Sequence, residues 1–455
     1  MAELHLWMNG VPVGVWTTLR TGRPVLRYLE SWAHAEEGRA LSLSLPFTAD
    51  LEHRGDAVTH YFENLLPDSA DIRRRLRRRF HARSDEAFDL LTAIGRDCVG
   101  AVQLLAPGAA PEGWNRIDAE PLKDRDVAAL LASVTSDAPL GQGEADDFRI
   151  SIAGAQEKTA LLRMGSKWHR PHGATPTTHI LKLPLGLVGN RRADMTDSVE
   201  NEWLCARIMS GLGFATAPTE MATFGDTRAL VVTRFDRRWQ GIVAGAELKA
   251  RFKPPEGAWI ARLPQEDFCQ ALGVAPDRKY QSDGGPSVQD CLKVLAASED
   301  ATEDRAVFSL AQLAFWLMAA TDGHAKNFSL QHRRGGRFSL TPMYDVLSAW
   351  PIIGNGPNQV AYPRARLAMS IRGEKNAHHH LRDIQPRHWQ RMALACGPGV
   401  WERMKALVGS VDAVLDAVAR ALPAGFPART WEPVSAGMRR HARLFQRAVE
   451  VGDGT

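Results

Sequence analysis

Two side chains that could carry out phosphoryl transfer lie close together in the stretch TDGHAKNFSL, where Asp322 and Asn327 are five residues apart. A carboxylate within hydrogen-bond reach of an attacking hydroxyl can orient or deprotonate that hydroxyl. Oxygen ligands can hold Mg²⁺ against phosphates, and a second carboxylate, Asp345, follows in LTPMYDVLS. The pattern therefore predicts Asp322 as the catalytic base and Asn327 and Asp345 as metal ligands.

The same spacing separates the Asp and the Asn of the catalytic loop in protein kinases. The kinase pattern is incomplete, because Phe-Gly does not follow Asp345. An alternative interpretation is a helix end that is capped by Asx side chains and has buried polar groups.

A lysine in an apolar strand could supply the nucleotide contact. Lys182 lies in THILKLP, next to Ile180 and Leu181. Burying its charge costs free energy unless an opposite charge meets it. An ATP phosphate could do so, and so could the carboxylate of Glu202, which stands on a predicted helix as in the Lys–Glu ion pair of kinases. A simple solvent-facing lysine is the alternative.

The stretch SIAGAQEKT, residues 151–159, looks at first like a phosphate-binding loop. A Walker-type loop needs bare glycine backbone before its lysine, so that amides can wrap the phosphates. Here Glu157 precedes Lys158, and its negative charge would crowd a phosphate. The stretch is therefore not a Walker loop, and a glycine-containing turn between two strands is the other interpretation.

The elements that must position these residues fall into four segments. The length of 455 residues predicts two or three domains, and loop-like composition separates residues 1–105 from a linker at 106–147 that holds a short helix. Residues 148–240 are strand-rich with one helix, and helical periodicity dominates residues 241–455. Asn9-Gly10 predicts an opening hairpin. A strand-rich lobe followed by a helical lobe predicts a ligand cleft between them.

Composition is that of an ordinary soluble globular protein, with a net charge of +4 and five scattered cysteines. Single cysteines without a CxxC pair indicate a reducing compartment rather than a disulfide framework or a zinc site. The sequence has neither a signal-peptide pattern at its start nor an apolar run of membrane-spanning length. We therefore expect a cytoplasmic protein without a membrane segment.

Long motifs along nearly the whole chain carry a family resemblance: ENLLPDS, FDLLTAIGRDCVGAVQLL, SIAGAQEKTALL, TPTTHILKLP, RFDRRW, RLPQEDFCQ, KYQSDGGPS, ATDGHAKNFS and LTPMYD. The sequence resembles the HipA-type serine/threonine kinases, the toxins of bacterial toxin–antitoxin pairs linked to growth arrest and persistence. The resemblance implies an α+β, phosphatidylinositol-kinase-like fold with a strand-rich N-lobe and an all-helical C-lobe, preceded by a small α/β N-terminal domain.

The resemblance also implies roles for individual residues, with ATP and Mg²⁺ as cofactors. Asp322 would be the catalytic base, and Ser151 would be autophosphorylated, which ejects its loop and inactivates the enzyme. Nucleotide contacts would come from the loop, the strand lysine, the hinge and the catalytic segments: Ala153, Gly154, Ala155, Gln156, Glu157, Lys158, Lys182, Thr233, Arg234, Phe235, His324, Ala325, Lys326, Asn327, Tyr344 and Asp345.

The implied partners are a HipB-like helix-turn-helix antitoxin, operator DNA reached mainly through that antitoxin, and a protein substrate. The substrate would be an aminoacyl-tRNA synthetase, with glutamyl-tRNA synthetase the first expectation. The family's basic DNA-contacting positions align with Leu394 and Gly397, so direct DNA contact is not expected. Two other functions stay open: a small-molecule phosphotransferase, and a transcriptional co-repressor subunit with a silent kinase.

Two further patterns favour surface structure over chemistry. In DIRRRLRRRF the residues Ile72, Leu76 and Phe80 recur every four positions, which predicts a helix with one packed face and arginines on the rest. A solvated basic face is the favoured interpretation, and contact with phosphate or an acidic partner is the alternative. The run His378 to His380 is expected in a surface loop, because three adjacent side chains cannot easily bind one ion.

Overall fold

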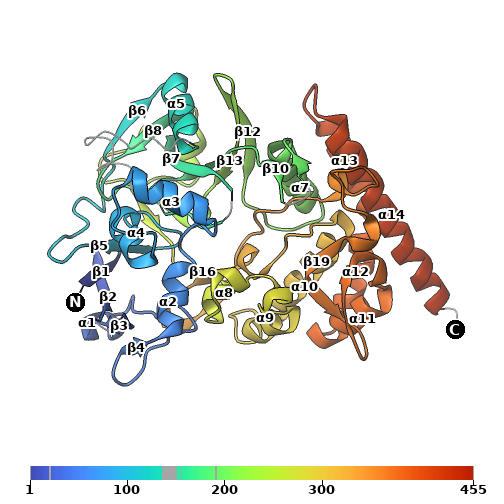
Figure 1. Ribbon diagram of the computed structural model, residues 1–455, viewed down its shortest axis with the longest axis horizontal. Helices are drawn as coiled ribbons and strands as arrows, with labels where there is room; N and C mark the ends of the chain where they lie inside the picture. Colours follow the sequence, from blue (N-terminus) through green and yellow to red (C-terminus); the bar gives the residue numbers. More distant parts are fainter. Residues whose placement is uncertain (1, 20–21, 136–150, 155, 190–191, 454–455) are drawn as a thin grey trace. The chain divides into compact units, whose positions relative to one another are not determined.

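The computed structural model describes residues 2–19, 22–135, 151–154, 156–189 and 192–453. The chain forms two compact units (Figure 1). The first consists of Met1–Leu183, Ala222–Asp277 and Ser329–Phe338, and the second of Pro184–Met221, Arg278–Phe328 and Ser339–Thr455. Each unit is described by itself.

The first unit begins with a five-stranded antiparallel sheet in the order β4-β3-β2-β1-β5. Its strands are β1 (Ala2–Met8), β2 (Val11–Thr18), β3 (Pro24–Tyr28), β4 (Glu52–Arg54) and β5 (Val102–Leu105). Asn9 and Gly10 join β1 to β2 with φ angles of 46° and 82°. Both central residues of the turn therefore have positive φ, and the predicted hairpin is confirmed.

Helices pack on this sheet and complete its core. They are α1 (Glu30–Ala33), α2 (Asp56–Glu63), α3 (Ala70–Arg79) and α4 (Ala87–Ile94). Leu4 and Leu6 of β1 alternate with more exposed neighbours, so one face of the strand is buried against apolar side chains of α2 and α4. This packing fixes the position of α3, whose Leu76 and Phe80 lie against the same core.

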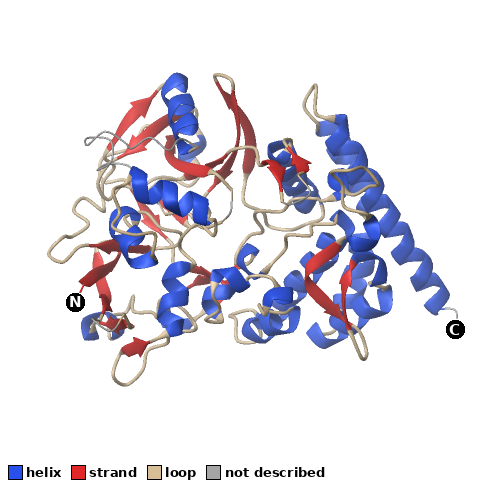
Figure 2. Ribbon diagram, in the orientation of Figure 1, coloured by secondary structure: helices blue, strands red, loops and turns tan. Residues whose placement is uncertain are grey.

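A six-stranded sheet in the order β12-β13-β9-β7-β8-β6 follows. Its strands are β6 (Ala119–Leu122), β7 (Lys158–Met164), β8 (Lys167–Pro171), β9 (His179–Lys182), β12 (Thr219–Phe224) and β13 (Thr227–Thr233). Helix α5 (Asp124–Val134) covers one face, where Val127 and Leu131 pack on Leu161, Leu181 and Val231 (Figure 2). The centre of this sheet therefore places β7 and β9 side by side.

Smaller elements follow these sheets. They are β14 (Arg237–Gln240), β15 (Trp259–Arg262), β16 (Gln265–Asp267), α8 (Phe268–Ala271), β17 (Ser329–His332), β18 (Phe338–Leu340) and the 3₁₀ turns η1 (Ala246–Leu248), η2 (Pro276–Arg278) and η5 (Arg334–Gly336).

A buried charge cluster connects the two larger sheets of the first unit. Asp97 precedes β5, and its carboxylate accepts hydrogen bonds from Arg237 Nη2 at 2.8 Å, Arg262 Nε at 3.2 Å and Thr177 Oγ1 at 2.7 Å. Arg234 is bound in the same cluster by Asp97 and Asp236. Burial raises the pKa of Asp97, but the three guanidinium groups outweigh it and hold that pKa well below its usual range.

Replacing Asp97 by asparagine should lower the free energy of unfolding by about 3–5 kcal/mol, because it leaves buried guanidinium charges without their carboxylate. Since the pKa of Asp97 is lower in the folded state, its contribution is present at neutral pH. That contribution is lost as pH falls below the unfolded pKa of roughly 4. Urea denaturation at pH 7 measures the effect. The exposed Asp226→Asn variant is the control, and equal urea midpoints for both variants would contradict the prediction.

The second unit is mainly helical. Its helices are α7 (Ser198–Gly211), α9 (Val288–Leu295), α10 (Ala301–Met318), α11 (Pro386–Cys396), α12 (Val400–Gly409), α13 (Val411–Ala421) and α14 (Ala428–Asp453). Helix α10 is buried from Phe308 to Met318. Helices α9, α11, α12 and α14 surround it (Figure 1), and its C-terminal end leads into the segment with Asp322.

Strands and 3₁₀ turns complete this unit. The strands are β10 (Gly186–Val188), β11 (Ala193–Met195), β19 (Arg366–Arg372) and β20 (Ala377–His380). The turns are η3 (Gln281–Asp283), η4 (Ala325–Asn327), η6 (Trp350–Ile352), η7 (Tyr362–Arg364) and η8 (Leu381–Asp383).

The predicted mixture of α and β structure is confirmed, but the prediction of an all-helical segment after residue 240 was wrong. Among the residues that the structure describes, this segment holds the six strands β15 to β20. Strand β19 shows why the periodicity misled: Leu367 to Ile371 are all buried. A strand covered on both faces has no alternation of apolar and polar residues, and Leu, Ala and Met favour helices.

The histidine run was also wrongly predicted to be a loop, since it forms β20 and pairs with β19. Successive side chains of a strand point to opposite faces, so His379 points away from His378 and His380. The ring of His378 stacks on that of His388 at 4.2 Å. Burial, with the nearby His378, lowers the pKa of His388 to about 4. No helix among the described residues is both long and apolar enough to cross a membrane.

Candidate functional site

The segment from Asp322 to Asn327 forms a tight loop after α10. Ala319 ends the helix in the left-handed region, with a φ of 49°. The amide of His324 then donates to the carbonyl of Asp322 at 2.8 Å, and the amide of Asn327 donates to the carbonyl of His324 at 2.9 Å. These bonds fold the loop back on itself and bring the side chain of Asn327 under the backbone of Asp322.

The carboxylate of Asp322 is accessible, with 54% of its side chain exposed. It accepts a hydrogen bond from the hydroxyl of Tyr280, and Nε2 of the buried His324 lies 3.9 Å from it. Tyr280 was not predicted as a site residue, although it lies within the KYQSDGGPS motif. An exposed carboxylate that is held from one side can meet an incoming hydroxyl from the other.

Asn327 links the loop to the segment with Asp345. Its Nδ2 donates to the carbonyl of Asp322 at 2.8 Å and lies 3.5 Å from the carbonyl of Asp345. This orientation turns Oδ1 away from both carbonyls and makes it the atom that a cation could contact. The hydroxyl of Tyr344 also donates to the carbonyl of Lys326 at 2.9 Å, so the second unit brings Asp322, Asn327 and Asp345 together.

Asp345 has an unusual backbone, with a φ of 58°. A residue with a Cβ atom in this region costs about 1–3 kcal/mol and persists where surrounding structure imposes it, often at functional sites. Asn327 contacts the carbonyl of Asp345. The hydroxyl of Tyr344, the residue before Asp345, donates to the carbonyl of Lys326. The strained conformation is therefore fixed by the same contacts that position Asn327.

These residues fit a magnesium ion. No group of three His, Cys, Asp or Glu side chains that could hold a metal occurs within the part of the chain that the structure describes. Mg²⁺ does not need such a group, since it usually keeps waters and binds through one or two protein oxygens plus substrate phosphates. The Oδ1 atom of Asn327 and the carboxylate of Asp345 are protein oxygens of this kind.

A pocket of about 380 Å³ adjoins Asp322 in the second unit. Its walls combine polar groups from Tyr280 and Asp283 with apolar side chains from Ile352 and Leu367. An acceptor that enters this pocket would meet the carboxylate of Asp322.

Two lysines face one another in the first unit. Lys158 of β7 stands directly opposite Lys182 of β9 in the antiparallel register. Lys182 is 6% exposed and Lys158 is half-buried. Directly opposed residues project on the same face, and like charges there are unfavourable. Two ammonium groups on one face of a sheet are groups that bind phosphate by charge-assisted hydrogen bonds.

The 151–158 loop leads into β7. Ser151 is fully buried, its hydroxyl donates to the carbonyl of Leu65 at 2.7 Å, and its amide donates to the carbonyl of Asp97 at 3.1 Å. Gly154 has a φ of 112°, which a side chain rarely adopts. Nζ of Lys158 folds back and donates to the carbonyl of Ala153 at 2.8 Å. The predicted contact residue Ala155 lies outside the described residues.

Gln156 and Glu157 connect the end of the loop to β9. Nε2 of Gln156 donates to the carbonyl of Leu183 at 2.5 Å, and the carbonyl of Glu157 accepts from the amide of Leu183 at 3.1 Å. The loop is thus held beside Lys182.

In the predicted hinge, Thr233 to Phe235, the side chain of Arg234 is held in the buried Asp97 cluster. Thr233 ends β13 and pairs with His179, and the half-buried Phe235 follows two residues later. The side chain of Arg234 is fixed in the Asp97 cluster, whereas its amide donates to the carbonyl of Thr178. Any contact of Arg234 with an adenine would therefore come from its main chain.

Glu202 is a buried residue of α7 in the second unit. His324, Ala325 and Lys326 are buried as well and form the turn before Asn327.

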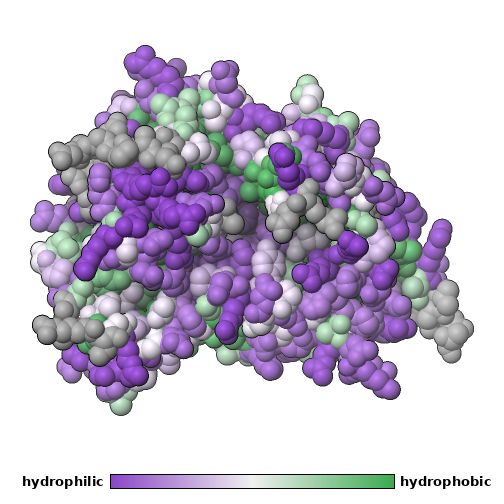
Figure 3. Space-filling model, in the orientation of Figure 1, coloured by the Kyte–Doolittle hydropathy of each residue, from purple (hydrophilic) through white to green (hydrophobic). Residues whose placement is uncertain are grey.

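The arginines of α3 are only partly solvated. Figure 3 shows a strongly hydrophilic patch over this helix, and Arg74, Arg77 and Arg78 are its exposed arginines. The other three contact protein groups: Arg73 pairs with Glu63, Arg75 pairs with Glu157, and Arg79 donates to the carbonyl of Ser133. The predicted solvated face is thus correct for one half of the arginines and wrong for the other, because α3 is flanked by acidic and carbonyl groups.

Comparison with known proteins assigns the family. A model described as the HipA-like C-terminal domain matches residues 150–422, and one described as the HipA N-terminal domain matches residues 4–105. The chain belongs to the HipA-like family. The predicted family resemblance is thereby confirmed.

Relatives match over most of their length. Y4mE of Sinorhizobium fredii, named as a candidate kinase, is 31% identical over 433 residues, covering 92% of this chain and 91% of that protein. The serine/threonine-protein kinase toxin HipA of Shewanella oneidensis is 27% identical over 343 residues, covering 71% of this chain and 69% of that protein. A solved structure of Shewanella oneidensis MR-1 HipA with HipB and operator DNA has a TM-score of 0.76, with 20% identity and 98% coverage of both chains. This likeness shows a shared fold.

Proposed function

We propose that this HipA-like protein is an ATP- and magnesium-dependent serine/threonine protein kinase that acts as a growth-arrest toxin. The observation that carries the proposal is that Asn327, in the tight loop with Asp322, contacts the main-chain carbonyls of both Asp322 and Asp345. Family membership and the names of the kinase relatives support it.

Each residue has a role in this proposal. Asp322 accepts the proton of the acceptor hydroxyl, and Tyr280 holds the carboxylate in place. Asn327 and Asp345 hold Mg²⁺, which would neutralise phosphate charge during transfer. Lys158 and Lys182 bind the phosphates, and the loop around Gly154 covers them. The main chain from Thr233 to Phe235 meets the adenine.

A protein is the proposed acceptor. The pocket beside Asp322 has both apolar and polar walls, which a segment of a protein substrate could contact. An aminoacyl-tRNA synthetase, glutamyl-tRNA synthetase first, is the proposed target on family grounds. Its inactivation would let uncharged tRNA accumulate and arrest growth, which accounts for persistence.

The proposed partner is a HipB-like antitoxin. The Shewanella oneidensis structure holds HipA together with HipB and operator DNA. We propose the same kind of complex for this chain. The antitoxin would bind the operator DNA, and the complex would repress transcription. In α11, Leu394 is apolar and 72% exposed. This position therefore has no positive charge with which to bind a DNA phosphate.

The proposal is tested by incubating the purified protein with labelled ATP, Mg²⁺ and a host lysate, followed by mapping of the phosphorylated sites. Label on Ser151 and on one synthetase is the expected result. Label on a different protein would support the kinase activity but identify a different target. No label on any protein would favour the co-repressor subunit, and label on small molecules alone would favour the phosphotransferase.

Autophosphorylation of Ser151 is the proposed off-switch. Its hydroxyl is buried against the carbonyl of Leu65, so a phosphate of roughly two negative charges would not fit there. The loop would have to leave its place, taking Lys158 away from the nucleotide. Ser151→Ala should therefore keep its activity during hours of preincubation with MgATP, while the wild type loses most of its own. An equal rate of loss in both proteins, measured as residual transfer to the target, would contradict the switch.

A further inference from the structure

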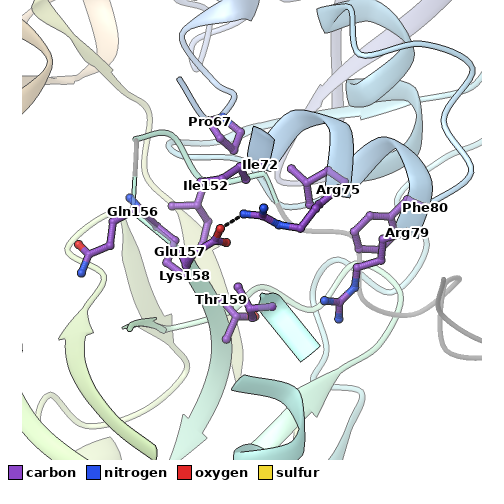
Figure 4. A pocket seen from close by; sticks show the side chains of 12 residues that line it. Pro67, Ile72, Arg75, Arg79, Phe80, Ile152, Gln156, Glu157, Lys158 and Thr159 are labelled. Atoms are coloured by element: carbon purple, nitrogen blue, oxygen red, sulfur yellow. Dashed lines mark ion pairs between the residues drawn. The ribbon is translucent and has the colours of Figure 1, made fainter. Parts of the chain in front are cut away.

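Glu157 poses an electrostatic problem within the proposed phosphate site. It places a carboxylate next to Lys158, in a loop that is proposed to lie against ATP phosphates. An unneutralised carboxylate there would repel the nucleotide. Its side chain, however, forms an ion pair with Arg75 of α3, and the exposed fractions are 24% and 21% for the two side chains (Figure 4). Partial burial limits the screening of this pair by salt.

Helix α3 presents Arg75 from a fixed position. Ser69 caps the first turn by accepting a hydrogen bond from the amide of Ile72. One turn after Arg75, the guanidinium of Arg79 donates to the carbonyl and the hydroxyl of Ser133 at 2.8 and 3.0 Å. Residues three and four apart share one face of a helix, so Ile72, Arg75 and Arg79 form one stripe that faces the loop across a small pocket of about 70 Å³ (Figure 4).

The rest of the loop is anchored to the residues just before α3. The amide of Asp68 donates to the carbonyl of Gly154 at 3.2 Å, and Pro67 and Gly154 form a parallel bridge. Together with the bond from the Ser151 hydroxyl to the Leu65 carbonyl, these main-chain contacts hold the first half of the loop. The pair between Arg75 and Glu157 is the charged contact at its other end.

We propose that Arg75 is a positioning residue for the nucleotide: it neutralises Glu157 and holds the segment 156–158 in the form that accepts ATP. The inference rests on the proposed kinase function and extends it to the N-terminal domain. With Glu157 paired to Arg75, its carboxylate does not oppose the contacts of Lys158 and Lys182 with the phosphates. Without Arg75, the carboxylate cancels one lysine and competes with the phosphates for it.

The test measures MgATP affinity and turnover for single and double variants of the full-length chain. Arg75→Ala should raise the Kd and the KM for MgATP about tenfold, as expected for one uncompensated charge near the site, with little change in kcat. Arg75→Lys keeps the charge and should stay near the wild type. The double variant Arg75→Ala with Glu157→Gln removes both charges and should recover an affinity within about threefold of the wild type.

Arg74→Ala is the matched control, because Arg74 lies on the same helix but pairs with Asp71 at the surface. It should leave MgATP affinity unchanged. Circular dichroism and a thermal scan show that each variant is folded, and amide exchange at residues 156–158 without nucleotide should be faster in Arg75→Ala.

The outcomes separate this inference from the function on which it rests. If the wild type binds no MgATP and transfers no phosphate, the proposed function fails and the role of Arg75 with it. If the wild type binds and Arg75→Ala binds equally well, only the role of Arg75 is overturned. If Arg75→Ala binds weakly and the double variant is no better, charge neutralisation is overturned.

Discussion

Phosphoryl transfer should fall about a thousandfold when Asp322 is replaced by asparagine, since a positioned base contributes roughly 10²- to 10⁴-fold. Asparagine keeps the size of the side chain and can still accept a hydrogen bond from Tyr280, so geometry is preserved while the proton acceptor is lost. Single-turnover transfer from labelled ATP, to Ser151 or to the target protein, measures the effect.

The Asp322→Asn variant should stay folded and still bind MgATP. The side chain of Asp322 is more than half exposed, and substitutions at such positions usually change stability by less than about 0.5 kcal/mol. MgATP should therefore still raise the thermal midpoint, because ligand binding stabilises the native state by mass action. Asp416→Asn, which removes a surface carboxylate that contacts Arg439, is the control. Full transfer by Asp322→Asn would refute the assignment of the base.

Short-range signals predicted the parts of the site that lie within one stretch of chain. The five-residue spacing of Asp322 and Asn327 depends only on the local turn, and the structure closes that turn with two main-chain hydrogen bonds. The hairpin at Asn9-Gly10 is equally local, because those residue types tolerate positive φ. The roles assigned to these residues in catalysis remain predictions.

Contacts between residues that are far apart in the chain could not be predicted from a single sequence. Asp97 meets guanidinium groups from residues 234, 237 and 262, and nothing near Asp97 indicates such partners. The partner of Arg75, Glu157, is likewise 82 positions away in the chain. In DIRRRLRRRF the arginines look equivalent, and only the packing of Leu76 and Phe80 on the core decides which of them face the loop.

Replacing Lys182 by methionine tests the phosphate site of the first unit, and transfer should fall by at least about a hundredfold, because a charge-assisted phosphate contact is lost. The substitution keeps the length and apolar stem of a side chain that is 6% exposed, so β9 should keep its pairing with β7 and β13. The stabilisation by MgATP should also disappear, unlike in Asp322→Asn. The two variants together would separate nucleotide binding from the chemical step.

Lys167→Met is the matched control, since Lys167 is an exposed residue at the start of β8 in the same sheet. It should retain both transfer and the thermal response to MgATP. A structural role for Lys182 predicts the opposite pattern: a lower thermal midpoint without nucleotide, but an undiminished rise when MgATP is added. Because Lys158 stands opposite Lys182 on the same face, one ammonium group would remain in the variant. A persistent thermal response would therefore show that Lys158 alone suffices for binding and that Lys182 is not the nucleotide contact.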